Sequence, residues 1–354
     1  MSRFWSDLVS RLNPYVPGEQ TESKSVTKLN TNESPFGPSE RVIEAISKCV
    51  GEDLRLYPDP RSLALRDAIA TVEGVSNSNV FVGNGSDEVL AHTFQAFFNS
   101  NKPILFPDIT YSFYPSYCRL FDLSYEQIPL NDNFVINVDS YSKENGGVIL
   151  PNPNAPTGID LGLAAIRKLL ENQSKQVVVI DEAYVDFGAQ SAAKLLGEFP
   201  NLLVTRSFSK SYALAGLRVG YALGQAELIE GLHRVKDSFN SYPVDRLATA
   251  GAIAAVQDRD YLDAVRRKIA SNREQLISGL TALDFLVLPS ATNFVFARHE
   301  TISATTLNQE LRKVDILVRH FTRPVRIEQF LRITVGTEAM VHKLLKSLKL
   351  ILRH

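Results

Sequence analysis

Short runs of apolar, often β-branched residues alternate with longer segments of helical periodicity from about residue 40 onward. Residues 86–98 and 161–171 place apolar side chains at three- and four-residue spacing, which predicts helices. The runs between such segments are nearly continuous in apolar residues, as strands covered on both faces are. We therefore predict an α/β fold with a mostly parallel sheet between two layers of helices. The predicted strands are residues 79–83, 103–107, 146–151, 176–181 and 201–208.

The pattern changes after about Val244. A long helical stretch, residues 246–283, precedes four short apolar runs and a final helical segment, which together predict a smaller α+β domain with its own sheet. The four runs are residues 285–290, 293–298, 315–321 and 330–336. We expect a large domain of residues 30–244 and a small domain formed by residues 1–29 and 245–354. Apolar residues at helical spacing between Phe4 and Leu12 predict a short amphipathic helix that ends near Pro14.

Composition and charge exclude several classes of protein. The 354 residues are 44% hydrophobic and carry a formal net charge of −1, so no strong field directs the chain to nucleic acid or to an anionic membrane. The two cysteines, Cys49 and Cys118, are too few for a disulfide framework or a metal cluster. No apolar run approaches the roughly 20 residues that span a bilayer, and charged residues interrupt the N-terminal segment where a signal peptide would be apolar. We expect a cytoplasmic protein without metal, membrane or nucleic-acid partners.

Polar motifs follow the predicted strands, where ligands bind in open parallel sheets. GNGSDE, residues 83–88, follows the first strand and opens a helix. Its glycines permit a tight turn, and the backbone N–H groups of Ser86 and Asp87 suit an anion such as phosphate. Taken alone, an ordinary helix cap at Ser86 or Asp87 is the favoured explanation of this motif.

Asp181 ends another predicted strand, and Tyr184 follows it. A carboxylate at such a place is costly unless a donor or a cation pairs with it, so Asp181 either caps a helix or serves as counter-ion to a protonated heterocycle. Lys210 follows the last of the five strands. A lysine there usually extends outward or pairs with a carboxylate, whereas a desolvated lysine can attack a carbonyl and hold it as a Schiff base.

In this order the motifs GNGSDE, TYSFY, PNPNAPTG, DEAYVDF, SFSKSYALAGLR and FLRITVGT resemble those of the fold-type-I pyridoxal-phosphate aminotransferases. LNPYVPGE, LNTNESPFGPS and LRLYPDP extend the resemblance over nearly the whole chain and are similar to the histidinol-phosphate aminotransferase family. The resemblance implies transamination of L-histidinol phosphate with 2-oxoglutarate, giving imidazole-acetol phosphate and glutamate, in histidine biosynthesis. Alternatives on the same scaffold are an aromatic or broad-specificity aminotransferase and a threonine-phosphate decarboxylase. A regulator that binds the cofactor without turnover is disfavoured, because such proteins carry an added DNA-binding module and none is visible.

The resemblance also implies a role for individual residues. Lys210 would hold the cofactor aldehyde and move a proton, Asp181 would pair with the ring nitrogen, and Tyr184 would donate to the ring oxygen. Tyr57 would reach the cofactor phosphate of a second subunit, so that a homodimer shares its active sites. Tyr111 would stack on the ring, with Phe113 and Tyr114 in the core. The cofactor phosphate would be held by Gly85, Ser86, Asp87, Ser207, Ser209 and Arg218, and the substrate by Tyr15, Arg319 and Arg332. The alternative for Arg319 is a surface strand residue paired with Asp or Glu.

One position departs from the family pattern. Ala155 stands where many relatives have an asparagine whose amide meets the ring oxygen. Asn154 or Asn152 could supply the amide from a neighbouring position, or Tyr184 could act alone. We expect Asn154 to take this role.

Overall fold

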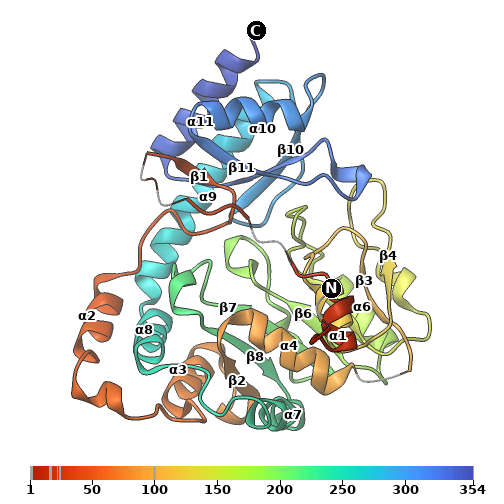
Figure 1. The fold of residues 1–354 in the computed structure, drawn as a ribbon, viewed down its shortest axis with the longest axis vertical. Coiled ribbons are helices and arrows are strands. Elements are labelled where there is room, and N and C mark those ends of the chain that lie inside the picture. The colour runs from red at the N-terminus through yellow and green to blue at the C-terminus, as the bar shows by residue number, and fades with distance from the viewer. Residues whose placement is uncertain (1–2, 16–17, 22, 24, 99–100, 354) are drawn as a thin grey trace.

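The computed structural model describes residues 3–15, 18–21, 23, 25–98 and 101–353, and these form two halves, each built on its own sheet (Figure 1). The larger sheet lies in the lower half of Figure 1 and the smaller sheet in the upper half, below the C-terminus. Among the described residues, no helix is both long and apolar enough to span a bilayer.

The larger sheet has seven strands in the order β2-β8-β7-β6-β5-β3-β4. All neighbouring strands are parallel except that β8 runs antiparallel to both β2 and β7, so the predicted mostly parallel sheet is confirmed. Two strands were not predicted, because β4 is largely exposed at the sheet edge and β8 is a five-residue run bounded by glycines. The strands are β2 (Val80–Gly83), β3 (Ile104–Pro107), β4 (Tyr125–Ile128), β5 (Val148–Pro151), β6 (Val178–Asp181), β7 (Leu202–Ser207) and β8 (Gly220–Gly224).

Helices cover both faces of this sheet because successive strand side chains point to opposite sides. Ile149 and Val179 pack on one side, whereas Leu150 and Ile180 pack on the other. The first side is covered by α4 (Gly85–Phe97), α5 (Tyr114–Leu120) and α7 (Ala226–Asp237). The second is covered by α2 (Glu40–Lys48), α3 (Leu63–Glu73), α6 (Leu163–Asn172) and α8 (Arg246–Gln257).

The smaller sheet has the order β1-β11-β12-β10-β9, with β1 parallel to β11 and the remaining pairs antiparallel. The helical stretch expected over residues 246–283 is two helices, because Asp258 has a non-helical ψ of 66° between them. The strands are β1 (Thr27–Leu29), β9 (Phe285–Val287), β10 (Phe294–His299), β11 (Ile316–His320) and β12 (Leu331–Thr334). The helices packed on them are α9 (Arg259–Thr281), α10 (Ala304–Lys313) and α11 (Glu338–Ile351).

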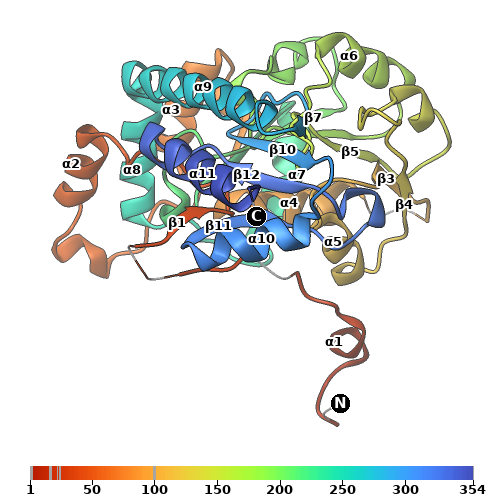
Figure 2. The same ribbon diagram turned by 90° about the horizontal axis from the view of Figure 1, so that it is seen from above.

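The N-terminal residues contact both halves. Strand β1 belongs to the smaller sheet, but α1 (Asp7–Arg11) projects away from the body of the molecule (Figure 2). Asn13 accepts a hydrogen bond from Arg119 at 3.2 Å, and the Tyr15 ring lies 4.9 Å from that of Phe113 on the larger half. Short 3-10 helices cover Glu52–Arg55, Asn77–Asn79, Val138–Tyr141, Val185–Phe187, Ala192–Leu195, Ala215–Leu217 and Val325–Ile327.

Candidate active site

A cavity of about 350 Å³ lies between the two sheets, at the carboxyl ends of β5, β6 and β7. Its volume is within the range of small-molecule sites. Most residues predicted to form the site line this cavity, whereas Gly85, Asn154 and Tyr57 do not. The predicted residues that line it are Tyr15, Ser86, Asp87, Tyr111, Asp181, Tyr184, Ser207, Ser209, Lys210, Arg218, Arg319 and Arg332.

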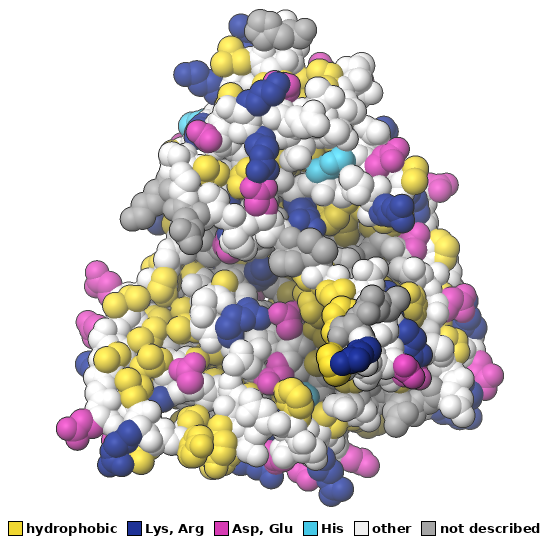
Figure 3. Space-filling view, viewed as in Figure 1, with side chains coloured by type: hydrophobic (Ala, Val, Ile, Leu, Met, Phe, Trp, Pro, Cys, Tyr) yellow, Lys and Arg dark blue, Asp and Glu magenta, His cyan; other side chains and the backbone are white. Residues whose placement is uncertain are grey.

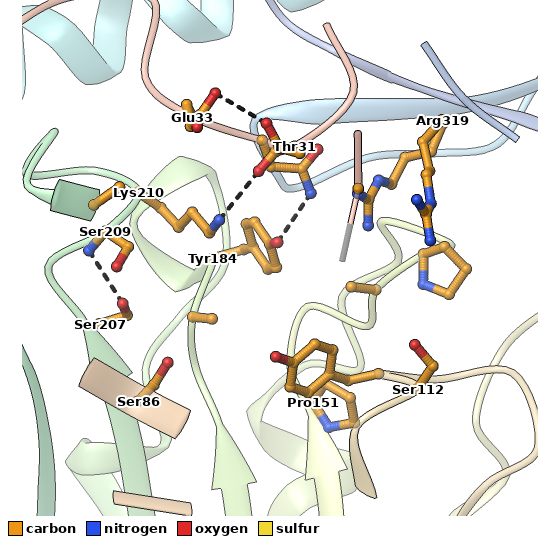
Figure 4. A pocket seen from close by; sticks show the side chains of 18 of the residues that line it. Thr31, Glu33, Ser86, Ser112, Pro151, Tyr184, Ser207, Ser209, Lys210 and Arg319 are labelled. Atoms are coloured by element: carbon orange, nitrogen blue, oxygen red, sulfur yellow. Dashed lines mark hydrogen bonds between the residues drawn. The ribbon is translucent and has the colours of Figure 1, made fainter. Parts of the chain in front are cut away.

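Lys210 follows β7 and extends toward the middle of the cavity, between Thr31 and Tyr184 (Figure 4). Its Nζ donates to the Thr31 carbonyl at 3.4 Å and lies 5.8 Å from the centroid of the Tyr184 ring. A carbonyl hydrogen bond of this length holds the amine only weakly. The amine is therefore available to react with a carbonyl or to carry a proton.

Asp181 ends β6 at the floor of the cavity and is 5% exposed. Tyr114 Oη donates to its Oδ2 at 2.8 Å, and Thr205 Oγ1 donates to Oδ1 at 3.4 Å. Burial raises the pKa of Asp181 to about 6, and hydrogen bonds from Tyr114, Ala183 and Thr205 limit the rise. A cationic ring nitrogen beside this carboxylate would remove the cost of burying its charge.

Tyr114, which the sequence interpretation assigned to the core, is in the core and also contacts the site. Its ring is fully buried, but its hydroxyl orients the Asp181 carboxylate. The signal available in the sequence was a tyrosine, where phenylalanine would fill the same space, because a buried tyrosine hydroxyl needs a partner.

A concave anion-binding surface lies at one end of the cavity, where the N-terminus of α4 meets β8. Gly85 has φ of 80°, and a Cβ there would lie 2.6 Å from Arg218 Nη2. A Cβ on Gly220 would lie 2.4 Å from the Ser86 nitrogen. Ser86 and Asp87 are in the first turn of α4, where backbone N–H groups have no acceptor within the helix. Both glycines therefore keep the approach to these donors and to Arg218 open.

The Asp87 carboxylate organises this anion-binding surface. Arg218 Nη2 donates to its Oδ2 at 2.8 Å, and Tyr111 Oη donates to its Oδ1 at 3.1 Å. Arg218 Nη1 also donates to Ser209 Oγ at 3.4 Å, and the Ser209 backbone N–H donates to Ser207 Oγ at 3.1 Å. Only the backbone of Asp87 was predicted to act here, yet its side chain orients both the arginine and the aromatic ring.

Two arginines face the cavity from the smaller sheet. Arg319 of β11 and Arg332 of β12 are directly opposite each other in the antiparallel register, so their side chains leave the same face. Figure 4 shows Arg319 on the far side of Tyr184 from Ser86, Ser207 and Ser209. Burial, together with the charge of Arg319, lowers the pKa of Arg332, and its buried Nε has no partner among the described residues. Two adjacent cations with an unused donor have the chemistry to bind a second anion.

The three remaining predicted residues are not in the cavity lining. Gly85 shapes the anion-binding surface from behind Arg218. The amide of Asn154 is turned away from the cavity and donates to the Ile109 carbonyl at 3.0 Å and to Thr157 Oγ1 at 3.1 Å, so its position does not fit the expected role. Ala155 lines the cavity in its place. Tyr57 is 79% exposed and stacks on Tyr242 at 4.6 Å, outside the cavity of its own chain.

The arrangement fits a phosphorylated pyridine aldehyde. The open glycine-walled surface beside Arg218 accommodates a phosphate, and the buried Asp181 carboxylate matches a protonated ring nitrogen. Lys210 is the amine placed to meet an aldehyde, between these two features and the arginine pair. A group held in this way still leaves the arginine pair for the anion of a second molecule.

Comparison with known proteins agrees with this geometry. The aminotransferase class I and II family matches residues 24–348. Histidinol-phosphate aminotransferase 2 of Thiobacillus denitrificans is 57% identical over 348 residues, covering 98% of each chain, and the histidinol-phosphate aminotransferase of Acetobacter pasteurianus is 57% identical over 352 residues, covering 99% of each. The crystal structure of histidinol-phosphate aminotransferase from Sinorhizobium meliloti in complex with pyridoxal-5'-phosphate superimposes with a TM-score of 0.89 at 27% identity, covering 100% of this chain and 98% of that one. The chain belongs to the class I and II aminotransferases and, within them, to the histidinol-phosphate aminotransferase family.

Proposed function

We propose that the protein uses pyridoxal phosphate to transfer the amino group of L-histidinol phosphate to 2-oxoglutarate, giving imidazole-acetol phosphate and glutamate. The observation that carries this proposal is the pair of opposed arginines, Arg319 and Arg332, at the end of the cavity away from the anion-binding surface. One arginine suffices for a carboxylate, but two converging guanidinium groups match a phosphate dianion. Family membership supports the same assignment.

The chain's own residues position the reaction. Bound pyridoxal phosphate supplies an electron sink for the substrate carbon that carries the amino group. Asp181 would hold the ring nitrogen protonated, which that electron sink requires, and Tyr114 donates a hydrogen bond that keeps the carboxylate in place. Lys210 would move a proton between the substrate Cα and the aldehyde carbon of the bound cofactor, in either direction of the reaction.

Residues at the arginine end of the cavity would orient the substrate. The phosphate of histidinol phosphate and a carboxylate of 2-oxoglutarate would bind Arg332 in turn, with Arg319 adding its second charge for the phosphate. Tyr15 closes the cavity beside Tyr111 and Phe113, with ring distances of 6.3 and 4.9 Å. These aromatic rings exclude water from the side on which the substrate side chain would lie.

We also propose a homodimer with shared active sites. The segment that includes α2 and the chain between α2 and α3 exposes Ile43, Val50, Leu54, Leu56 and Tyr57, and Figure 3 shows hydrophobic side chains gathered on the side where α2 and α8 lie. Contiguous exposed apolar surface of this kind is typical of protein interfaces. Tyr57 lies within this segment, is exposed, and does not line the cavity of its own chain. A residue that contacts the cofactor of a second subunit would have this position.

Steady-state kinetics with three amino donors test the proposed reaction. Histidinol phosphate, phenylalanine and threonine phosphate would be compared with 2-oxoglutarate as acceptor, with glutamate formation and carbon dioxide release measured together. We expect the highest kcat/KM for histidinol phosphate and no carbon dioxide. A higher kcat/KM for phenylalanine would assign an aromatic aminotransferase, and carbon dioxide release from threonine phosphate would assign a decarboxylase.

A further inference from the structure

Asn32 connects the smaller sheet to the Tyr184 hydroxyl. Its Nδ2 lies 2.9 Å from Tyr184 Oη, the contact drawn at Tyr184 in Figure 4. Its Oδ1 lies 3.1 Å from Oγ1 of Thr334, the last residue of β12. Asn32 is 1% exposed and lines the cavity. It therefore joins a residue expected to touch the cofactor to a strand that carries Arg332.

The backbone of Asn32 is fixed as firmly as its side chain. Its N–H donates to Thr334 Oγ1 at 3.0 Å, and its carbonyl accepts from Asn293 Nδ2 at 3.0 Å. Its φ of 56° lies in the left-handed region, which asparagine, aspartate and glycine tolerate best. The side chain is thus held in one position relative to Tyr184.

The hydrogen-bond pattern determines which end of the amide faces Tyr184. Thr334 Oγ1 already accepts the Asn32 backbone N–H, so its own proton is available for the side-chain atom 3.1 Å away. Thr334 Oγ1 donates to that atom, which is Oδ1, and Nδ2 therefore lies toward Tyr184. Because the amide nitrogen can only donate, Tyr184 Oη accepts from it.

This leaves the single Tyr184 proton to be donated elsewhere. Tyr184 lines the cavity beside Lys210, so the proton is directed to a group bound there. Ala155, also in the cavity wall, has no donor in its side chain, and the Asn154 amide is engaged with Ile109 and Thr157.

We propose that Asn32 is a positioning residue that holds Tyr184 as a hydrogen-bond donor to the cofactor ring oxygen, through an amide that Thr334 orients. The inference rests on the proposed function, because it requires that oxygen to be present. In the family pattern, an asparagine amide at the position of Ala155 reaches the ring oxygen directly. Here the Asn32 amide, from the other half of the molecule, would act on that oxygen indirectly, through the Tyr184 hydroxyl.

The test is a spectrophotometric pH titration of the protein with its cofactor bound, in Asn32→Gly and Tyr184→Phe and in the double variant. Glycine accepts the backbone conformation of Asn32 and leaves charge unchanged. Donation to the ring oxygen stabilises negative charge there, so losing it should raise the pH midpoint of the cofactor absorbance change by about one unit. We expect each single variant to raise the midpoint and the double variant to match Tyr184→Phe.

Thr334 offers a matched pair that leaves Asn32 in place. Thr334→Ser keeps the hydroxyl and should keep the midpoint of the unmodified protein. Thr334→Val removes the proton that orients the amide and should raise the midpoint in the same direction as Asn32→Gly. Lys210 and Arg332, charged neighbours of Tyr184, are unchanged in every variant.

Two results would overturn the inference. One is an Asn32→Gly shift that is equally large in the Tyr184→Phe background, and the other is no shift from Asn32→Gly or Thr334→Val while Tyr184→Phe does shift the midpoint. Failure of the unmodified protein to take up pyridoxal phosphate at all would instead contradict the proposed function. If Asn32→Gly fails to fold, the Thr334 pair decides alone.

Discussion

At the scale of one residue, the buried Asp181 carboxylate lowers the stability of the cofactor-free protein. Its carboxylate is buried at the end of β6, and burial raises its pKa to about 6. Because the native state then holds the proton more tightly than the unfolded chain does, the free energy of unfolding falls as pH rises from about 4 through 6. A rise in the pKa of Asp181 to about 6 corresponds to at most about 3 kcal/mol of lost stability.

The variant Asp181→Asn should therefore stabilise the cofactor-free protein in a pH-dependent way. We expect almost no difference from the unmodified protein at pH 4 and a higher free energy of unfolding at pH 8, measured by urea denaturation. The same variant should bind pyridoxal phosphate more weakly, because the ring nitrogen loses its counter-ion. A stability difference that stays constant between pH 4 and pH 8 would contradict the assigned burial cost.

The sequence led to single residues only where a motif pointed to them. Lys210, Asp181 and Arg218 follow predicted strands within recognisable motifs, and all three line the cavity. Asn32 and the side chain of Asp87 were missed, because their roles depend on partners more than 100 residues away, Thr334 and Arg218. Tyr114 was missed because a buried aromatic ring is usually explained by packing alone.

At the scale of elements, the contact of β8 with the N-terminus of α4 shapes the anion-binding surface. The antiparallel strand β8 begins at Gly220, against the first turn of α4. The sequence predicted α4 but not β8. Its place between β2 and β7 depends on long-range pairing that local periodicity does not encode.

Gly220→Ala should damage this contact. The added methyl would meet the Ser86 nitrogen at 2.4 Å, so α4 or β8 must move, at a cost of about 1–3 kcal/mol. We expect a lower melting temperature and a higher Kd for pyridoxal phosphate. Gly216→Ala is the matched control, because a Cβ there has no neighbour within 4 Å among the described atoms. Equal effects of the two variants would contradict the close contact.

The register of β11 and β12 places Arg319 opposite Arg332, and this pair should determine which substrate charge is preferred. Arg319→Ala removes one of two opposed cations and should raise KM for histidinol phosphate about tenfold or more while changing KM for phenylalanine little. Arg298→Ala, an exposed arginine of β10 that does not line the cavity, is the control. Steady-state kinetics with both donors measure the difference, and equal changes in the two KM values would remove the argument for a phosphate.

At the scale of the whole molecule, the proposed homodimer predicts that two inactive variants restore activity when they pair with each other. Lys210→Ala and Tyr57→Ala should each lower activity strongly when pure. If Tyr57 serves the second subunit, unfolding and refolding the two variants together should restore about a quarter of the activity of the unmodified protein, because random pairing gives one intact site in half of the dimers. Activity no higher than that of the separate variants would contradict shared active sites.

The two-sheet architecture was foreseen from the sequence more fully than the way in which the halves join. Alternating strands and helices predicted the larger sheet, and the change after Val244 predicted the smaller one. Residues 1–29 were expected in the small domain, and β1 does lie in its sheet, but the contact of Tyr15 with the other half was not foreseen, because no periodic pattern spans it.

The two anion sites belong to different halves of the molecule, with Ser86 and Arg218 on one and Arg319 and Arg332 on the other. The distance between the two anion sites therefore depends on how the two halves pack against each other, and no individual side chain determines it. Among phosphorylated donors, we expect such a gap to select by length: a donor with one methylene more or fewer between its amine and its phosphate would fit the arginine pair less well when its amine is placed at Lys210. Remote substitutions that tilt one half against the other should consequently alter the preferred length of the substrate before they alter the chemistry.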